Sequence, residues 1–314
     1  MKLAIVLPCY NEEEVIDYSN EILCGVILNL LQNRIVEDVS IVYVDDGSCD
    51  KTWERIESLS AQRHINPKIT GIKLAKNVGH QNALMAGIKS AYLDGYDAII
   101  TIDADLQDDV SCIRNMVELA KQGNDIVYGV RKDRGTDTFF KRYSAQMFYK
   151  LMRSLGCDIV FNHADFRLMT RKAVEALMSY SERNLFLRGL VKDIGLPSGY
   201  VLYDRKERKA GKSKYPLLSM INFALEGITS FSIRPLRIIS FVGVVCIFIS
   251  VILILYGLYS FIVGKALPGW TSIIVSLWFI GGIIILTMGV IGEYIGKIYK
   301  EVKNRPRYFI EKKI

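Results

Sequence analysis

Two aspartates separated by one residue, Asp103 and Asp105, are the part of this chain best suited to chemistry. They follow the apolar run Ala98–Ile102, and Gln107 comes two residues after them. Two carboxylates and an amide oxygen suit a hard cation such as Mg²⁺ or Mn²⁺, which completes its shell with water and phosphate oxygens. The pattern predicts a metal and diphosphate site at Asp103, Asp105 and Gln107. The alternative is an acidic turn that caps the helix expected from Val110.

Polar residues also follow two earlier predicted strands. Tyr10 and Glu12 come after the first apolar run of the chain, and Asp46 comes after the second. A tyrosine can stack on a base, and a carboxylate can accept hydrogen bonds from a nucleobase edge or a ribose hydroxyl. These residues predict nucleotide contacts. Acidic residues at a helix N-terminus also favour its dipole, and both interpretations can hold together.

A third group of residues is cationic and consists of Arg131, Arg142, Arg208 and Lys214. Phosphates need fixed donors, and arginine offers two in one plane. The segment around Arg208 and Lys214 resembles a flexible anion-binding loop, although the GxxxxGK[ST] pattern of a P-loop is absent. We expect phosphate contacts from this group. A solvated basic surface is the alternative.

Asp165 stands two residues before Arg167 in a segment, Asn162–Arg167, expected to be a loop or a short strand. An aspartate beside an arginine is usually an ion pair. The functional interpretation is a base or an orienting group near the acceptor. The three histidines, His64, His80 and His163, are scattered along the chain, and we assign none of them a catalytic role.

Short apolar runs alternate with helical stretches in the first half of the chain, which predicts an α/β fold. Continuously apolar strands indicate a mostly parallel, Rossmann-like sheet with helices on both faces. Ligands of such sheets bind beyond the carboxyl ends of the strands, where the polar motifs lie. Strands are expected at Leu3–Leu7, Val39–Val44, Ile69–Leu74, Ala98–Ile102 and Ile126–Val130, and helices at Glu12–Leu31, Asp50–Leu59, Gly79–Leu93, Val110–Lys121 and Thr136–Leu155.

Two uncharged apolar runs, Ile238–Val263 and Ala266–Gly292, follow this polar part. Each exceeds the roughly 20 residues that span a bilayer core. The expected organisation is a catalytic domain at 1–214, an amphipathic juxtamembrane helix at 215–234, a two-helix transmembrane hairpin at 235–292 and a basic tail at 293–314. Packing against the domain is the alternative for the amphipathic helix. Small residues around Gly292 could pack helices, including helices of a homo-oligomer.

The basic residues on both sides of the hairpin predict its orientation, because such residues mark the cytoplasmic side of a membrane. We therefore expect a multi-pass protein of the plasma or inner membrane, with the catalytic domain and both termini in the cytoplasm. The six cysteines include no CxxC pair, which argues against a zinc site and suits a reducing compartment. The net charge of +7 is the only feature that points to nucleic acid, so no such partner is expected.

Taken together, these motifs resemble those of inverting family 2 glycosyltransferases with the GT-A fold, and within them the polyprenyl-phosphate enzymes: bactoprenol glucosyltransferases and dolichol-phosphate mannose synthases. The resemblance covers essentially the whole chain, and the two apolar runs match the bactoprenol branch. One departure is Val110, where relatives commonly have proline. The matching pieces are Pro8-x-Tyr10-Asn11-Glu12, Val44-Asp45-Asp46-Gly47-Ser48, Asn77-x-Gly79, Asp103-Ala104-Asp105-Leu106-Gln107-Asp108, Gly129-x-Arg131, Ala164-Asp165-Phe166-Arg167 and Arg208-x-x-Gly211-x-Ser213-Lys214.

The resemblance implies a role for each matching residue. Nucleotide-sugar contacts fall on Pro8, Tyr10, Glu12, Val44, Asp46 and Asp103. Metal ligands are Asp103, Asp105 and Gln107, and catalytic roles fall on Asp105 and Asp165. Phosphate or lipid-phosphate contacts fall on Arg131, Arg142, Arg208, Ser213 and Lys214.

The resemblance also implies a reaction: transfer of a hexose, with glucose favoured, from a UDP-sugar to polyprenyl phosphate with help from Mg²⁺ or Mn²⁺. The alternatives are a GDP-mannose or UDP-N-acetylhexosamine transferase and a polysaccharide synthase, which usually carries more spans and an Arg/Gln-x-x-Arg-Trp motif. A non-catalytic membrane scaffold is the least favoured. A nicotinamide dehydrogenase is disfavoured because no GxGxxG follows Leu3–Leu7.

Overall fold

The computed structural model describes residues 1–62, 67–132, 163–183, 185–204, 234–263 and 269–314. Several expectations lie outside these ranges. They are the phosphate contacts at Arg142, Arg208, Ser213 and Lys214, the helix at Thr136–Leu155, the amphipathic helix at 215–234 and the histidine His64.

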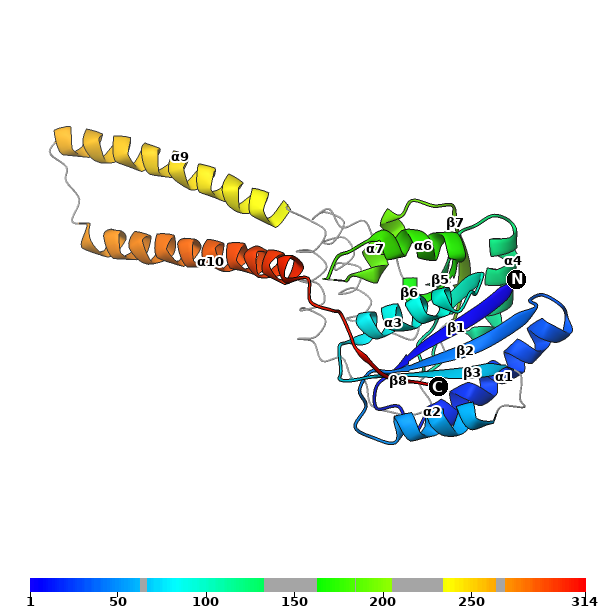
Figure 1. Ribbon diagram of the computed structural model, residues 1–314. Helices are drawn as coiled ribbons and strands as arrows, with labels where there is room; N and C mark the ends of the chain where they lie inside the picture. Colours follow the sequence, from blue (N-terminus) through cyan, green and yellow to red (C-terminus); the bar gives the residue numbers. More distant parts are fainter. Residues whose placement is uncertain (63–66, 133–162, 184, 205–233, 264–268) are drawn as a thin grey trace.

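The described strands form one sheet in the order β7-β5-β6-β4-β1-β2-β3-β8 (Figure 1). Parallel pairing joins β1 to β2 and β4, β2 to β3, and β5 to β7. Strand β6 lies antiparallel between β4 and β5, and β8 pairs antiparallel with β3. This is the mostly parallel α/β sheet that the sequence predicts. The strands are β1 (Lys2–Cys9), β2 (Asp38–Asp45), β3 (Lys68–Leu74), β4 (Ala98–Thr101), β5 (Ile126–Arg131), β6 (His163–Thr170), β7 (Ser198–Tyr203) and β8 (Ile310–Lys313).

Helices cover both faces of the sheet because successive side chains of a buried strand point to opposite faces. In β1, Leu3, Ile5 and Leu7 belong to one core cluster, and Ala4 and Val6 belong to the other. The first cluster is covered by α1 (Ile16–Gln32), α2 (Thr52–Ala61), a 3₁₀ turn (Val110–Cys112) and α4 (Ile113–Lys121). The second is covered by α3 (His80–Leu93), α6 (Arg171–Ser179) and α7 (Leu187–Asp193).

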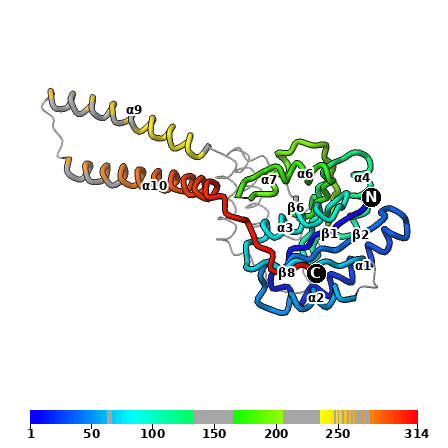
Figure 2. Tube along the Cα trace, in the orientation of Figure 1, coloured from blue at the N-terminus to red at the C-terminus, as the bar shows by residue number. Residues whose placement is uncertain are grey.

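Two long helices project from this domain as a hairpin, α9 (Arg234–Ile262) and α10 (Trp270–Lys303) (Figures 1 and 2). Within the described residues, one segment, Phe279–Lys303, is long and apolar enough to cross a membrane, with a mean hydropathy of 1.8 and none of it buried in the protein. Helix α10 continues to Lys303, so no structural boundary falls at Gly292, where the apolar run ends.

Residues 293–314, expected as a basic tail, do not form a separate segment in this structure: α10 continues to Lys303, and the last residues pair with the sheet. The end of the chain returns to the sheet as β8, in red beside β3 in Figure 1. Three of its charged side chains are paired: Glu311 with Lys73, Lys312 with Glu57 and Lys313 with Asp94. The backbone of Ile314 also exchanges two hydrogen bonds with Gly71, at 2.9 and 3.1 Å. A short charged segment carries no periodic apolar signal, and only the free edge of β3 makes it a strand.

Helix α3 lies unusually close to the sheet, and a glycine makes this possible. A Cβ atom added at Gly87 would overlap the side chain of Val6 and lie 2.8 Å from Cγ2 of Val44. Because Val6 in β1 and Val44 in β2 are both fully buried, neither side chain has room to move away. The position of α3, and of the residues at its N-terminus, therefore depends on Gly87.

We predict that Gly87→Ala lowers the free energy of unfolding by about 1–2 kcal/mol, since overpacking outweighs the gain in helix propensity. Gly25→Ala in α1 is the matched control, because no atom lies within 4 Å of a Cβ added there. That change should stabilise the protein by up to about 1 kcal/mol. Thermal unfolding of both purified variants measures the two effects, and equal shifts of the same sign would contradict the close approach of α3.

Candidate active site at the carboxyl ends of β1 and β4

The register of β6 brings the two main acidic motifs together. Thr101 at the end of β4 is paired with Arg167, and the strands run in opposite directions. Asp165 therefore lies beyond the end of β4, level with Asp103. The hydroxyl of Thr101 donates to the backbone oxygen of Asp165 at 2.5 Å and anchors this crossing. An antiparallel strand inserted into a parallel sheet thus adds a carboxylate to the edge where ligands bind.

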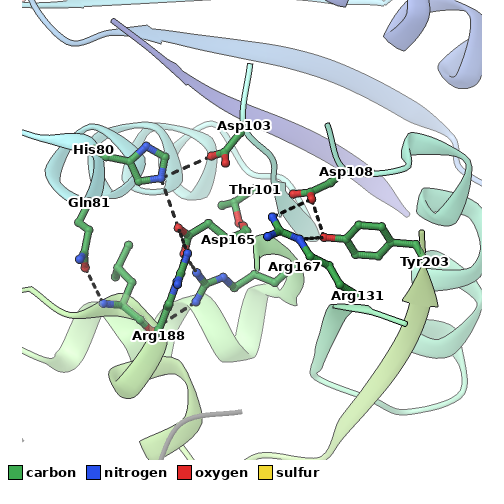
Figure 3. Close-up of polar contacts among 11 residues, drawn as sticks. His80, Gln81, Thr101, Asp103, Asp108, Arg131, Asp165, Arg167, Arg188 and Tyr203 are labelled. Carbon is green, nitrogen blue, oxygen red and sulfur yellow. Dashed lines mark hydrogen bonds and ion pairs between the residues drawn. The ribbon is translucent and has the colours of Figure 1, made fainter. Parts of the chain in front are cut away.

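Asp165 is the centre of a network of charged groups (Figure 3). Its Oδ1 accepts from Nη2 of Arg167 at 2.5 Å and from Nε of Arg188 at 3.2 Å, and its Oδ2 accepts from Nη2 of Arg188 at 3.0 Å. Arg167 is 1% exposed and Arg188 comes from α7. The ion pair expected between Asp165 and its neighbouring arginine is therefore present, and a second arginine that the sequence did not indicate joins it.

His80 also lies in this network, although from the sequence alone no histidine is assigned a catalytic role. Its Nε2 is 3.5 Å from Oδ2 of Asp165 and 3.6 Å from Oδ1 of Asp103. His80 is the first residue of α3 and directly follows the Asn77-x-Gly79 motif, which was the one signal available in the sequence. The imidazole lies between two carboxylates, one in the loop after β4 and one in β6.

Asp46 holds the loop that carries His80. Its two carboxylate oxygens accept the backbone N–H groups of Val78 at 2.8 Å and Gly79 at 3.0 Å. Gly79 has φ of 89°, a left-handed conformation that favours glycine. Asp46 is 3% exposed, so its main contacts in this structure are to the backbone that begins α3.

The pKa values of Asp103 and Asp165 are shifted in opposite directions by their surroundings. Burial and the nearby carboxylates raise the pKa of Asp103 to about 6, although His80 opposes this shift. Burial alone would raise the pKa of Asp165, but Arg188, His80 and Arg167 outweigh it and hold that pKa well below its usual range. Burial lowers the pKa of His80, yet Asp165 and Asp103 more than compensate, so its pKa is raised. Asp165 therefore stays ionised at a pH near 6, at which Asp103 begins to take up a proton.

The loop after β4 has the features of a cation site. Leu106 adopts a left-handed φ of 45°, and Asp105 Oδ1 accepts from the backbone N–H of Gln107 at 3.2 Å, which fixes the turn. Within the described ranges, no three acidic, histidine or cysteine side chains already form a metal cage. However, Oδ1 of Asp103 is buried and accepts no hydrogen bond in the described part of the chain. This orphaned oxygen, with Asp105 and Gln107 beside it, fits a hard divalent cation.

A second cluster surrounds Asp108, one residue after Gln107. Its Oδ1 accepts from the Tyr203 hydroxyl at 2.6 Å and from Nη2 of Arg131 at 3.1 Å. These contacts join the loop to β5 and β7. The Arg131 side chain is 23% exposed, so part of the guanidinium still faces solvent beside the loop. Asp109 caps the 3₁₀ turn by accepting from the N–H of Ser111, as the alternative interpretation of an acidic turn expected.

The residues expected to contact a nucleotide lie at the ends of β1 and β2. Pro8 and Val44 are register partners in these strands, and Val44 is fully buried. Tyr10 is 39% exposed at the end of β1. The N–H of Glu12 donates to the Thr52 hydroxyl at 2.8 Å, which ties the loop after β1 to α2. The parallel pairing thus places one exposed aromatic ring at the same sheet edge as the carboxylates.

Comparison with known proteins agrees with this geometry. Residues 4–178 match Glycosyl transferase family 2, and residues 234–298 match the GtrB C-terminal hairpin. The uncharacterized glycosyltransferase YkoT of Bacillus subtilis is 50% identical over 310 residues, which cover 98% of this chain and 91% of that protein. The SfII prophage-derived bactoprenol glucosyl transferase of Shigella flexneri is 39% identical over 317 residues, covering 99% of this chain and 98% of that protein.

A prophage bactoprenol glucosyl transferase homolog of Escherichia coli is also 39% identical, over 99% of both chains. The similarity to these relatives therefore includes the acidic loops, the strand that carries Asp165 and both helices of the hairpin. The chain belongs to glycosyl transferase family 2 and carries a hairpin of the GtrB type at residues 234–298.

Proposed function

We propose that this glycosyltransferase moves glucose from UDP-glucose to a polyprenyl phosphate at a membrane surface. The observation that carries the proposal is the near full-length similarity, hairpin included, to proteins named bactoprenol glucosyl transferase. The site supports it, because an orphaned carboxylate oxygen and an exposed tyrosine suit a metal-bound nucleoside diphosphate. The apolar segment Phe279–Lys303 supports a lipid-confined acceptor.

The reaction is a single displacement. An oxygen of the lipid phosphate attacks C1 of the sugar, the bond from C1 to the diphosphate oxygen breaks, and UDP leaves from the opposite face. The configuration at C1 is inverted. The second pKa of a phosphate monoester is about 6, so the nucleophile is already largely dianionic at neutral pH. The acceptor therefore needs no proton removed by the protein.

Asp103, Asp105 and Gln107 would hold the cation, which would offset the negative charge that develops on the departing diphosphate. The chain's own residues have a complementary task. His80, Arg167 and Arg188 surround Asp165, which keeps three cationic side chains oriented at the sheet edge. We infer that Asp165 positions cations and the sugar and does not act as a general base.

The hairpin explains why the catalytic domain and its acceptor meet. Two helices of this length would hold the domain at the head-group plane, where a polyprenyl phosphate is confined. With the basic residues flanking the hairpin on the inner side, both termini and the domain would face the cytoplasm. A homo-oligomer built through the small residues of α10 is compatible with this arrangement.

The first prediction from the proposed function concerns the sugar. Membranes that contain the protein, incubated with radiolabelled UDP-glucose and extracted with organic solvent, should yield a labelled glycolipid. A parallel panel of UDP-galactose, UDP-N-acetylglucosamine and GDP-mannose tests the alternatives. If the sugar is transferred from one of those donors and not from UDP-glucose, that sugar is the substrate in place of glucose. If no donor gives a labelled lipid, the proposed function is refuted.

The second prediction concerns the metal. EDTA should reduce transfer to undecaprenyl phosphate by at least about 10²–10³-fold, the loss expected for several kcal/mol of charge stabilisation, and Mg²⁺ or Mn²⁺ should restore it. The double variant Asp103→Ala/Asp105→Ala should be equally impaired and should not respond to added metal. Glu118→Gln, an exposed acid on α4, is the control for loss of a carboxylate. Full activity of the double variant in EDTA would show that the reaction does not need a metal.

The third prediction concerns Asp165. Asp165→Asn leaves the buried Arg167 without its charged partner and should lower the free energy of unfolding by about 3 kcal/mol, whereas Glu118→Gln, which breaks an exposed pair, should cost less than about 1 kcal/mol. Because the folded-state pKa of Asp165 is depressed, this stability difference is present at neutral pH and is lost only as pH falls below about 4. Thermal unfolding against pH measures it.

Enzyme kinetics distinguish a positioning role of Asp165 from a role as general base. Asp165→Asn should lower turnover by less than about 10⁴-fold, with a deficit that does not depend on pH between about 6 and 9. A larger loss that shrinks as pH rises would show that the carboxylate removes a proton.

A further inference from the structure

A second cationic site lies away from the carboxylates, where the C-terminal end of α10 meets the domain. A cavity of about 290 Å³ opens there. Five of its lining side chains are basic and come from two distant parts of the chain. They are Arg183, between α6 and α7, and Lys300, Lys303, Arg305 and Arg307, at and after the end of α10.

The backbone around this cavity is held in place by specific contacts. Both carboxylate oxygens of Glu301 accept from the N–H of Arg183 at 2.8 Å. Nε of Arg183 donates to Oδ1 of Asn304 at 2.8 Å, and Asn304 ends α10 in a left-handed conformation with φ of 46°. Nη2 of Arg307 donates to the backbone oxygens of Tyr180 and Glu182. The end of α10 is therefore fixed to the segment before α7.

The charge of the cavity is incompletely balanced by the described residues. Nε of Arg307 is buried and has no hydrogen-bond acceptor in the described part of the chain. Burial lowers the pKa of Arg307 and the nearby Arg183 lowers it further, although Tyr308, Glu301 and Glu182 partly oppose the shift. Lys303 lies 4.3 Å from the ring centre of Tyr299, a contact that leaves its charge unneutralised. Lys300, Lys303 and Arg305 are exposed at the cavity, so their charges are available to an anion that also reaches the buried Nε of Arg307.

This cavity is separate from the carboxylate site, although both touch the first turn of α3. Asn82 lines the cavity, whereas His80 contacts Asp103 and Asp165. Two residues along a helix are about 200° apart around its axis, so the two side chains leave α3 on nearly opposite sides. An anion in the cavity would not occupy the place of the diphosphate.

We propose that this cavity binds the phosphate of an anionic membrane phospholipid. The proposal rests on the membrane insertion included in the proposed function. The apolar segment Phe279–Lys303 ends at the cavity, so membrane insertion would place its cations at the head-group level. Basic residues at that level attract anionic lipids. A lipid bound here would fix the domain against the membrane surface through α10 and α3 together.

The test uses the full-length protein in a neutral maltoside detergent. Binding of dihexanoyl phosphatidylglycerol is measured by titration, with dihexanoyl phosphatidylcholine and inorganic phosphate as the comparison probes. Wild type should prefer phosphatidylglycerol over both. Lys300→Gln/Arg305→Gln should weaken that binding by about 10–30-fold, since each cation near an anionic surface contributes about a factor of five. The matched control, Lys68→Gln/Lys89→Gln, removes two exposed lysines on the domain and should bind as wild type does.

Three results would overturn the proposal. The first is that Lys300→Gln/Arg305→Gln binds phosphatidylglycerol as tightly as wild type does, and the second is that wild type binds phosphatidylcholine as tightly as phosphatidylglycerol. The third is that inorganic phosphate binds as tightly as phosphatidylglycerol, which would indicate a site for free anions. Two further measurements show whether only the lipid site has been disproved or the proposed function as well. Retention of the protein in carbonate-washed membranes tests insertion, and glucose transfer in the same detergent tests the reaction.

Discussion

The site depends on the carboxylate of Asp165 and the cations around it. Strand β6 contributes the aspartate and Arg167, α7 contributes Arg188, and the N-terminus of α3 contributes His80. These elements are far apart in the sequence and meet at one edge of the sheet. A buried guanidinium such as that of Arg167 is tolerated only with an anion beside it, so the same interaction that orders the site also makes the packing of α7 on β6 possible.

The two carboxylates nearest His80 have different environments. Asp165 accepts from two arginines and stays ionised, whereas the buried Oδ1 of Asp103 accepts no hydrogen bond, lies 3.6 Å from Nε2 of His80 and belongs to a carboxyl with a raised pKa. A divalent cation would stabilise the charged form of Asp103 and would do little for Asp165. This difference is consistent with Asp103 as a metal ligand and Asp165 as a residue that orients positive charge.

The C-terminal part of the chain belongs to the domain as much as to the hairpin. After α10 the chain crosses back and adds β8 to the free edge of β3, while Glu301 and Arg307 bind the segment between α6 and α7. These contacts, made at and after the C-terminal end of α10, restrict how the domain can tilt relative to that helix. A membrane-bound enzyme gains from such restriction, because its acceptor is confined to one plane.

The sequence by itself determined the features that depend on local pattern. The apolar runs predicted β1 to β5, helical periodicity predicted α1 to α4, and two long uncharged runs predicted the hairpin helices. The acidic loop after β4 and the ion pair of Asp165 with its neighbour were also readable, since residue type and spacing along the chain carry them. Only the tertiary structure decided that β6 runs antiparallel to β4, which sets Asp165 beside Asp103 and recruits His80 and Arg188. It also decided that a charged C-terminal segment becomes β8. Pairing across more than 60 residues depends on which sheet edges and helix ends are adjacent in space, and no short-range periodicity records that.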